Sequence, residues 1–312
     1  MRDLKGLPFW TVGSVALAAA LLHLWTAGFG YFEPREQRSL HLLLLLPLAF
    51  LLFPARRGSP LARPTGPDWI LAALATLPSL YSFHCANGGV SCAAPINMRF
   101  ENVDPLSGME LGLGVILIAL LVEALRRAVT PILAGLVGLG IVYLFLTEHS
   151  PGILHFRHIP FEQIVENMYL LNGMGAYGSI TGISATMVAV FIVFGAFIEG
   201  SGLGRFFHNL GMRVAGRYSG GPAKVEVISS SLFGTISGSS VANVFATGSF
   251  TIPAMIKLGY KLHFAAGVEA AASVGGQIMP PVMGAGAFVM AEITNIPYST
   301  IAVAAILGSL LY

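Results

Sequence analysis

The chain has 312 residues, of which 55% are hydrophobic and only 10% are charged. Soluble domains carry about 25% charged residues because their surface must stay hydrated, so this composition excludes an ordinary soluble enzyme. The net charge of +2 excludes a nucleic-acid-binding protein that works through a strongly basic face. The 37 glycines and 18 prolines are scattered through apolar runs, which is typical of membrane helices. We therefore expect an integral membrane protein in a lipid bilayer, without a nucleic-acid partner.

The first half of the chain contains five apolar runs that predict membrane helices. A helix needs about 20 apolar residues to cross a hydrocarbon core of about 30 Å. The predicted runs cover residues 9–30, 40–52, 69–83, 111–125 and 132–146. We expect the first four to form a four-helix membrane region over residues 1–127, and residues 128–312 to form a second membrane region.

The placement of basic residues predicts the orientation in a bacterial inner membrane, because Lys and Arg concentrate on the cytoplasmic side. A cytoplasmic N-terminus leaves only four of the 17 basic residues outside, namely Arg35, Arg38, Arg99 and Arg157. The loop between the third and fourth runs is then external, and it holds Cys85 and Cys92. An oxidising periplasm allows a disulfide there. Two unpaired small residues are an equally good interpretation.

The second half contains segments that are interrupted or amphipathic. Residues 184–198 predict another span, and residues 200–217 predict an amphipathic helix along the cytoplasmic face. Residues 222–257 are polar near the middle and basic at both ends. Each half of about 16 residues reaches about 24 Å, which is too short for a core of about 30 Å. We therefore predict a re-entrant helical hairpin whose polar tip is buried in protein or lines a cavity.

Residues 264–292 predict a broken helix, because the stretch GGQIMPPVMG lies in their middle. Each proline removes a backbone donor and clashes with the preceding turn. A last apolar run follows Pro297 and continues to Tyr312. An unwound stretch exposes carbonyl oxygens that can coordinate sodium, and the helix N-termini at a break favour an anion. A polar-tipped hairpin next to a broken helix is therefore typical of an ion-coupled transport site.

The candidate site residues are the small, polar and proline residues at the hairpin tip and at the break. They are Ser237, Gly238, Ser239, Ser240, Asn243, Gly275, Gly276, Gln277, Pro280 and Pro281. We expect them to bind the substrate and the transported sodium ion, and we expect no resident metal ion or cofactor. Alternatively, small residues only let helices pack closely, and Ser230 in the first arm is expected to be such a neutral position. Among ionisable residues in apolar runs, Glu269 is a functional candidate, whereas His23 has no evident partner.

Two motifs that would indicate an enzyme or an ATPase do not occur in the sequence. The G-x-S-x-G motif of serine hydrolases needs a glycine where Ala242 stands. Residues 216–224 lack the spacing and the following Ser or Thr of a phosphate-binding loop. We therefore expect that the protein is not an enzyme, and that transport is driven by an ion gradient or by a partner.

At FGTISGSSVANVFATGSFTIPAMIKLGY and VEAAASVGGQIMPPVMGAGAFVMAE the sequence resembles the tripartite ATP-independent periplasmic (TRAP) transporters. It is most similar to fused small-plus-large membrane subunits associated with TAXI-type binding proteins. The resemblance is specific from about Glu123 onward and loose over the first four runs, which occupy the place of the small subunit. It implies an elevator-type, sodium-driven importer that accepts a small organic acid from a periplasmic substrate-binding protein. It also implies that residues 237–243 and 275–281 supply half of the substrate and sodium sites.

The large subunit of that family contains two inverted repeats, each with a hairpin and a broken helix, whereas this sequence contains one of each. Inverted repeats build their site at a shared interface. We therefore expect a missing second half, either in a longer reading frame or on a separate polypeptide. The alternative function is a non-transporting remnant or assembly subunit that needs a second polypeptide.

Overall fold

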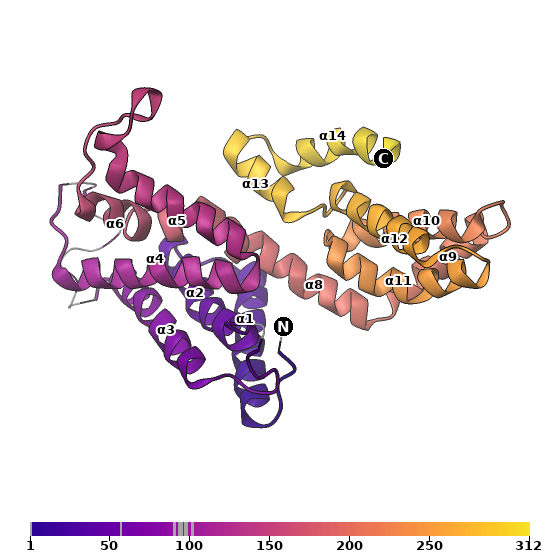
Figure 1. Cartoon of the computed structure of the whole chain (residues 1–312), viewed down its shortest axis with the longest axis horizontal. Coiled ribbons are helices and arrows are strands. Elements are labelled where there is room, and N and C mark those ends of the chain that lie inside the picture. The colour runs from indigo at the N-terminus through magenta and orange to yellow at the C-terminus, as the bar shows by residue number, and fades with distance from the viewer. Residues whose placement is uncertain (1, 57, 90–91, 93–95, 97–98, 101–102) are drawn as a thin grey trace. The chain divides into compact units, whose positions relative to one another are not determined.

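A computed structural model describes residues 2–56, 58–89, 92, 96, 99–100 and 103–312 of the chain (Figure 1). Over these residues the chain is helical and forms no strand of a sheet, so the all-α prediction is confirmed there. The chain divides into two compact units, Met1–Thr186 and Met187–Tyr312. We refer to them as unit 1 and unit 2.

Unit 1 contains the five helices that the sequence predicts in its first half, followed by two short ones. They are α1 (Leu7–Phe29), α2 (Pro34–Leu52), α3 (Gly66–Ala86), α4 (Gly108–Ala128), α5 (Pro131–Leu146), α6 (Phe161–Tyr169) and α7 (Ser179–Ile183). Helices α1, α3 and α4 are long and apolar enough to cross a membrane. So are the stretches Pro131–His149 and Ser179–Ile198, which makes five such helices among the described residues. A multi-pass membrane protein follows from their number and length.

Two helices begin earlier than the apolar runs predict, because polar side chains cap their first turns. Thr65 and Asp68 form a capping box at the start of α3, and Ser107 and Glu110 form another at the start of α4. Each box satisfies backbone N–H groups that the first turn of a helix leaves unpaired. Helices α3 and α4 therefore begin at Gly66 and Gly108 rather than at the predicted residues 69 and 111.

Helix α2 begins at Pro34 rather than at the predicted residue 40, because its polar first turns are buried. Arg35 donates to the carbonyl oxygen of Tyr169 at 2.8 Å and to the hydroxyl of Ser82 at 2.8 Å. Its guanidinium also lies over the ring of Tyr177 at 4.3 Å. Such a turn is polar, so it is not part of an apolar run. It can still be buried in a packed core, because the guanidinium has several hydrogen-bond acceptors.

A network of buried ion pairs joins three segments at one end of unit 1. The carboxylate of Asp68 accepts from Arg2 at 2.6 Å and from Arg127 at 2.7 Å. Arg127 also donates to Glu123 at 2.6 Å. The N-terminus, the start of α3 and the end of α4 therefore meet at the same end, as expected of segments that lie on one side of a membrane.

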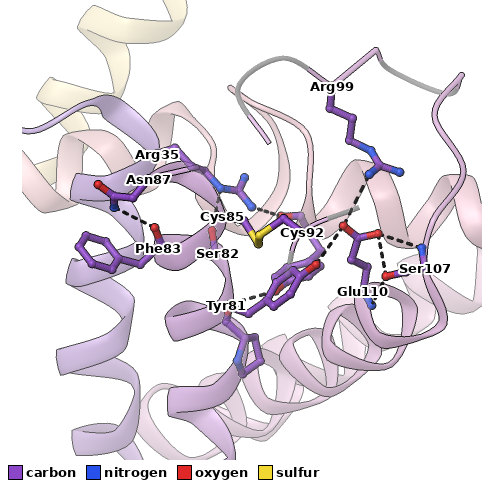
Figure 2. The surroundings of a disulfide bond; sticks show 12 residues. Arg35, Tyr81, Ser82, Phe83, Cys85, Asn87, Cys92, Arg99, Ser107 and Glu110 are labelled. Atoms are coloured by element: carbon purple, nitrogen blue, oxygen red, sulfur yellow. Dashed lines mark hydrogen bonds and ion pairs between the residues drawn. A yellow bond between two sulfur atoms is a disulfide. The ribbon is translucent and has the colours of Figure 1, made fainter. Parts of the chain in front are cut away.

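The disulfide between Cys85 and Cys92 forms in the structure, which decides between the two interpretations that the sequence leaves open (Figure 2). Next to it, the buried Glu110 accepts from the hydroxyl of Tyr81 at 3.2 Å and from the backbone N–H of Ser107 at 2.8 Å. Arg99 lies 3.7 Å from the same carboxylate. The disulfide and these contacts hold the described part of this loop against the ends of α3 and α4 (Figure 2).

Unit 2 contains the hairpin and the broken helix that the sequence predicts. Its helices are α8 (Ala189–Gly200), α9 (Leu203–Ala215), α10 (Gly221–Ser237), α11 (Ser240–Lys257), α12 (Leu262–Gly275), α13 (Ala285–Thr294) and α14 (Tyr298–Leu311). The predicted hairpin is α10 and α11, and the predicted amphipathic helix is α9. The predicted broken helix is α12 and α13, separated by a short 3-10 turn (Gly276–Ile278) and an extended stretch. Helices α9 to α12 pack side by side (Figure 1).

Replacing Asp68 by Asn should strongly destabilise unit 1. The change removes the charge that Arg2 and Arg127 share, so the buried Arg2 loses its carboxylate and Arg127 keeps only Glu123. Breaking a buried pair in this way costs about 3–5 kcal/mol of unfolding free energy. The measurement is the loss of helical circular dichroism on heating the purified chain in detergent.

Glu148→Gln is the control for Asp68→Asn, because the side chains of the Glu148–His158 pair are 55% and 68% exposed. A substitution at such a surface site should change stability by no more than about 0.5 kcal/mol. Equal effects of Asp68→Asn and Glu148→Gln would show that the buried network is not important for stability.

Candidate functional site

The tip of the hairpin is a left-handed turn between α10 and α11. Gly238 has φ +57°, which favours glycine, and a Cβ at this position would overlap the carbonyl oxygen of Met283. The next residue, Ser239, is the N-cap of α11, and its hydroxyl accepts from the backbone N–H of Ala242 at 3.3 Å. Glycine is therefore required at the tip for both backbone conformation and space.

The unwound stretch of the broken helix runs past this tip and is hydrogen-bonded to it. The backbone N–H of Val282 donates to the carbonyl of Thr235 at 3.2 Å. The side-chain amide of Gln277 donates to the hydroxyl of Ser240 at 3.0 Å, and its backbone carbonyl accepts from Gly284 at 2.7 Å. The two interrupted elements of the sequence therefore meet at one place in unit 2.

A cavity of about 420 Å³ lies where they meet, and we call it the tip cavity. Its polar lining comes from the hairpin tip, Gln277 and the stretch before α13, and its apolar lining includes Phe191 and Phe288. The hydroxyl of Ser237 is buried without a hydrogen-bond partner. The cavity falls within the range of about 300–1,000 Å³ that is usual for small-molecule sites.

Two helices begin at the wall of the tip cavity. Ser239 and Gly284, which line it, are the N-caps of α11 and α13. The N-terminus of a helix carries a partial positive charge and unpaired backbone N–H groups, so it attracts anions. The cavity can therefore hold a small anion, such as a carboxylate, together with an apolar part of the same molecule.

Only some of the ten predicted site residues line the tip cavity. Ser237, Gly238, Ser239 and Gln277 do. The other six belong to the hairpin or to the break but do not line the cavity, namely Ser240, Asn243, Gly275, Gly276, Pro280 and Pro281.

Asn243 holds the two arms of the hairpin together instead of facing the tip cavity. Its side chain is fully buried, and its amide donates to the carbonyl of Ser230 at 3.0 Å. Gly276 packs against the same amide and against Gly234, so closely that a Cβ at 276 would lie 2.9 Å from the amide nitrogen. These small residues therefore let the break approach the hairpin.

Ser230 is not the neutral packing position that the sequence predicts. It is fully buried, its hydroxyl donates to the carboxyl of Glu226, and its carbonyl accepts from Asn243. Glu226 itself is missed by the sequence analysis. The pattern that could have indicated it is the spacing of four residues, one helical turn, between Glu226 and Ser230 and between Glu269 and Ser273.

The structure also gives His23 a partner that the sequence does not reveal. In unit 1, the ring nitrogens of His23 and His41 lie 2.8 Å apart. His41 in turn lies 3.1 Å from the hydroxyl of Ser184. The other ring nitrogen of His23 lies 2.6 Å from the carbonyl of Ala19. Two neutral imidazole rings can supply the donors and acceptors for all these hydrogen bonds. The contact between His23 on α1 and His41 on α2 therefore requires no charge.

Residues 115–312 match the family described as tripartite ATP-independent periplasmic transporter, DctM component. The match covers unit 2, including the tip cavity, and extends into unit 1 from within α4. No solved structure matches the chain.

Individual relatives match shorter parts of the chain. The isethionate TRAP transporter permease protein DctMQ of Oleidesulfovibrio alaskensis is 39% identical over 34% of this chain and 17% of its own length. The C4-dicarboxylate TRAP transporter large permease protein DctM of Rhodobacter capsulatus is 35% identical over 30% of this chain and 21% of its own length. The 2,3-diketo-L-gulonate TRAP transporter large permease protein YiaN of Escherichia coli is 28% identical over 36% of this chain and 25% of its own length. The chain thus matches only a minor part of each relative.

Replacing Gly234 by Ala should loosen the packing between the hairpin and the break. An added Cβ would overlap the Cα of Gly276, and such overpacking costs about 1–3 kcal/mol of unfolding free energy. Gly267→Ala is the matched control, because a Cβ there meets nothing within 4 Å and its backbone is helical. That change should be neutral or stabilise α12 by up to about 1 kcal/mol. Thermal unfolding of both variants in detergent compares them, and equal stability would mean that the approach of Gly234 and Gly276 is not tight.

Proposed function

The chain belongs to the DctM component family of the tripartite ATP-independent periplasmic transporters, and on that premise we propose that it is a permease component that imports small organic acids. The observation that carries the proposal is the tip cavity, where the N-termini of α11 and α13 meet beside an unpaired serine hydroxyl. Family membership supports transport across a membrane instead of enzymatic chemistry.

The chemistry of the tip cavity supports a carboxylate as the substrate class. Two helix N-termini favour an anionic group, and Phe191 and Phe288 offer an apolar surface to its carbon chain. The three relatives carry names that refer to isethionate, C4-dicarboxylate and 2,3-diketo-L-gulonate. Each of these is a small organic anion. C4-dicarboxylates and 2,3-diketo-L-gulonate are carboxylates, whereas isethionate is a sulfonate, so two of the three names agree with the proposed class.

Sodium is the proposed coupling ion, bound near the same tip. A sodium ion that loses its water needs several oxygen ligands, and the hairpin offers the hydroxyls of Ser237 and Ser239 beside the backbone carbonyls of the break. Gln277, on the other wall of the tip cavity, adds an amide oxygen. Substrate and ion would then bind close together, so that each favours the other.

The finer organisation of the transporter is part of the proposal. Residues 1–127 supply four helices in the place of a small subunit, fused to the large-subunit part in residues 128–312 as in TAXI-type transporters. The hairpin and the broken helix move as an elevator-type body and are completed by a second inverted repeat. A periplasmic substrate-binding protein delivers the organic acid.

The proposed orientation puts the N-terminus in the cytoplasm. The ion-pair network around Asp68 lies at the cytoplasmic end, and the disulfide lies in the periplasm, where oxidation is favoured. Both ends of the hairpin are cytoplasmic in this proposal. The hairpin is basic at both of its ends, and each of its arms is short for a bilayer.

Replacing Ser237 or Ser239 by Ala should raise the sodium concentration that uptake requires. Loss of one oxygen ligand from a site of low polarity costs about 1–3 kcal/mol. This corresponds to a sodium affinity that is weaker by roughly five- to a hundredfold. The measurement is uptake of a radiolabelled C4-dicarboxylate by liposomes that contain this chain, a polypeptide with the second repeat and a loaded binding protein.

Ser231→Ala is the control for these serine variants, because its hydroxyl donates within its own helix to the carbonyl of Val227 at 2.7 Å. It should leave the sodium dependence of uptake unchanged. If Ser237→Ala and Ser239→Ala behave like this control, the tip hydroxyls do not bind sodium. If the complete system takes up no substrate with or without sodium, the non-transporting alternative is favoured.

Thiol labelling of intact cells tests the orientation. After mild reduction, Cys85 and Cys92 should react with a membrane-impermeant reagent added from outside. Cysteines introduced as Ala223→Cys and Lys261→Cys should react only after lysis, because Ala223 lies in the first turn of α10 and Lys261 follows α11, at the two ends of the hairpin that are proposed to be cytoplasmic. Labelling of either introduced cysteine from outside would contradict the re-entrant hairpin, and protection of both native cysteines would reverse the orientation.

A further inference from the structure

Unit 2 contains a cluster of six buried polar side chains that is separate from the tip cavity. Three helices contribute one pair each, and no side chain of the six is more than 1% exposed. The members of this carboxyl cluster are Glu226 and Ser230 on α10, Thr247 and Thr251 on α11, and Glu269 and Ser273 on α12. None of them lines the tip cavity.

The hydroxyl of Thr247 connects the two carboxyl groups of the cluster. It lies 3.3 Å from Oε1 of Glu226 and 2.9 Å from Oε1 of Glu269. Thr251 donates to the other oxygen of Glu269 at 2.6 Å, and Ser230 donates to Oε1 of Glu226. The same hydroxyl also lies 2.8 Å from the carbonyl of Asn243. Since one hydroxyl has one proton, Thr247 cannot donate to both carboxyl groups at once.

The carboxyl cluster has no positive partner in the part of the chain that the structure describes. The basic side chains on the helices packed around it are Arg205, His208 and Arg213 on α9, Lys224 on α10, Lys257 on α11 and His263 on α12. No ion pair joins any of them to Glu226 or Glu269. All of them except His208 are exposed. Two neighbouring buried carboxylates without a cation repel each other, which favours protonation of one of them.

Two further observations mark this as a formed site. Oε2 of Glu226 is buried without a hydrogen-bond partner, and an ionised oxygen in that position would lack both water and a donor. On the neighbouring helix, Gly248 makes room for the other carboxyl group, since a Cβ there would lie 2.9 Å from Cδ of Glu269. The free oxygen is a place for a proton, and the glycine lets the carboxyl of Glu269 pack directly against α11.

We propose that Glu226 and Glu269 together bind one exchangeable proton. Helices α10, α11 and α12 then carry a proton-binding site that is separate from the tip cavity. In the bound state one carboxyl is neutral and the other is an ionised acceptor stabilised by Thr251. On release the proton leaves to water and both carboxylates are charged. Because the resulting repulsion opposes the packing of α10, α11 and α12, release of the proton and opening of this packing must occur together.

Infrared spectroscopy of the full chain in lipid bilayers tests this proposal directly. A protonated carboxyl shows a C=O band that shifts in D2O, and the pH is varied from about 5 to about 9 in sodium-free buffer. The wild-type band should persist at neutral pH and disappear at a higher pH. In Glu269→Gln the repulsion is gone, so Glu226 should lose its proton at a pH that corresponds to at least about tenfold weaker proton affinity. The double variant with Glu226→Gln and Glu269→Gln should show no such band.

Two further variants separate a proton site from a general change in folding. Glu292→Gln on α13 alters an exposed carboxyl and should leave the band and its titration unchanged. Thr247→Val keeps both carboxyl groups but removes the shared hydroxyl, so the band should remain and change frequency.

The same spectra define the results that would overturn the proposal. A wild-type spectrum without the band at any pH would show that the pair holds no proton. A band that is lost when sodium is added at constant pH would show that the pair binds sodium in place of a proton. Because the spectra do not depend on uptake, these outcomes are independent of whether the chain transports an organic acid.

Discussion

The site depends on the need of every buried backbone group for a hydrogen-bond partner. An interrupted helix in a membrane leaves N–H and C=O groups that neither lipid nor water can satisfy. In unit 2 the backbone N–H of Val282 in the break donates to the carbonyl of Thr235 in the hairpin, and the side chains of Gln277 and Ser240 also join the two elements. Within the break itself, Gly284 donates to the carbonyl of Gln277. The break is therefore stabilised partly by its own backbone and partly by the hairpin beside it, and the tip cavity forms where they meet.

Close approach of the backbones is the second requirement, and it explains the small residues. Gly234 and Gly276 are in contact, and Gly238 lies against the carbonyl of Met283. A side chain at any of these positions would separate the hairpin from the break and expose the unpaired groups of both. Packing and shaping of the tip cavity are thus not alternative roles for Gly238, because it packs against Met283 and also lines the cavity.

Both units bury charged groups, but they stabilise them in different ways. In unit 1 Asp68 is held by two arginines, and Arg35 by backbone oxygens and an aromatic ring. Such contacts fix a charge permanently and hold the helices in place. In the carboxyl cluster of unit 2 the hydrogen-bond partners that the described residues give Glu226 and Glu269 are hydroxyl groups. Hydroxyls can donate to a carboxylate or accept from a carboxylic acid, so they are compatible with either protonation state.

The sequence by itself determined the features that depend on neighbouring residues. Long apolar runs predict membrane helices, and the prolines and glycines of residues 275–284 predict the break, because helix formation and helix termination are local. The structure has helices at these places and in this order, with the break between α12 and α13, although α2 is not among the helices long and apolar enough to cross a membrane. Helix ends were less accurate, since capping residues such as Thr65 and Ser107 and the buried polar turn around Arg35 are not part of any apolar run.

Only the tertiary structure decided which distant side chains meet. Ser230 and Ser273 are 43 positions apart and belong to one cluster, while Asn243, predicted to bind a ligand, instead ties Ser230 to the second arm. The sequence likewise left two equal interpretations of Cys85 and Cys92, and the structure shows that they form a disulfide. These contacts depend on how helices are rotated and how closely they pack, and the hydrophobic pattern of a membrane helix carries little information about rotation because lipid and protein core are both apolar.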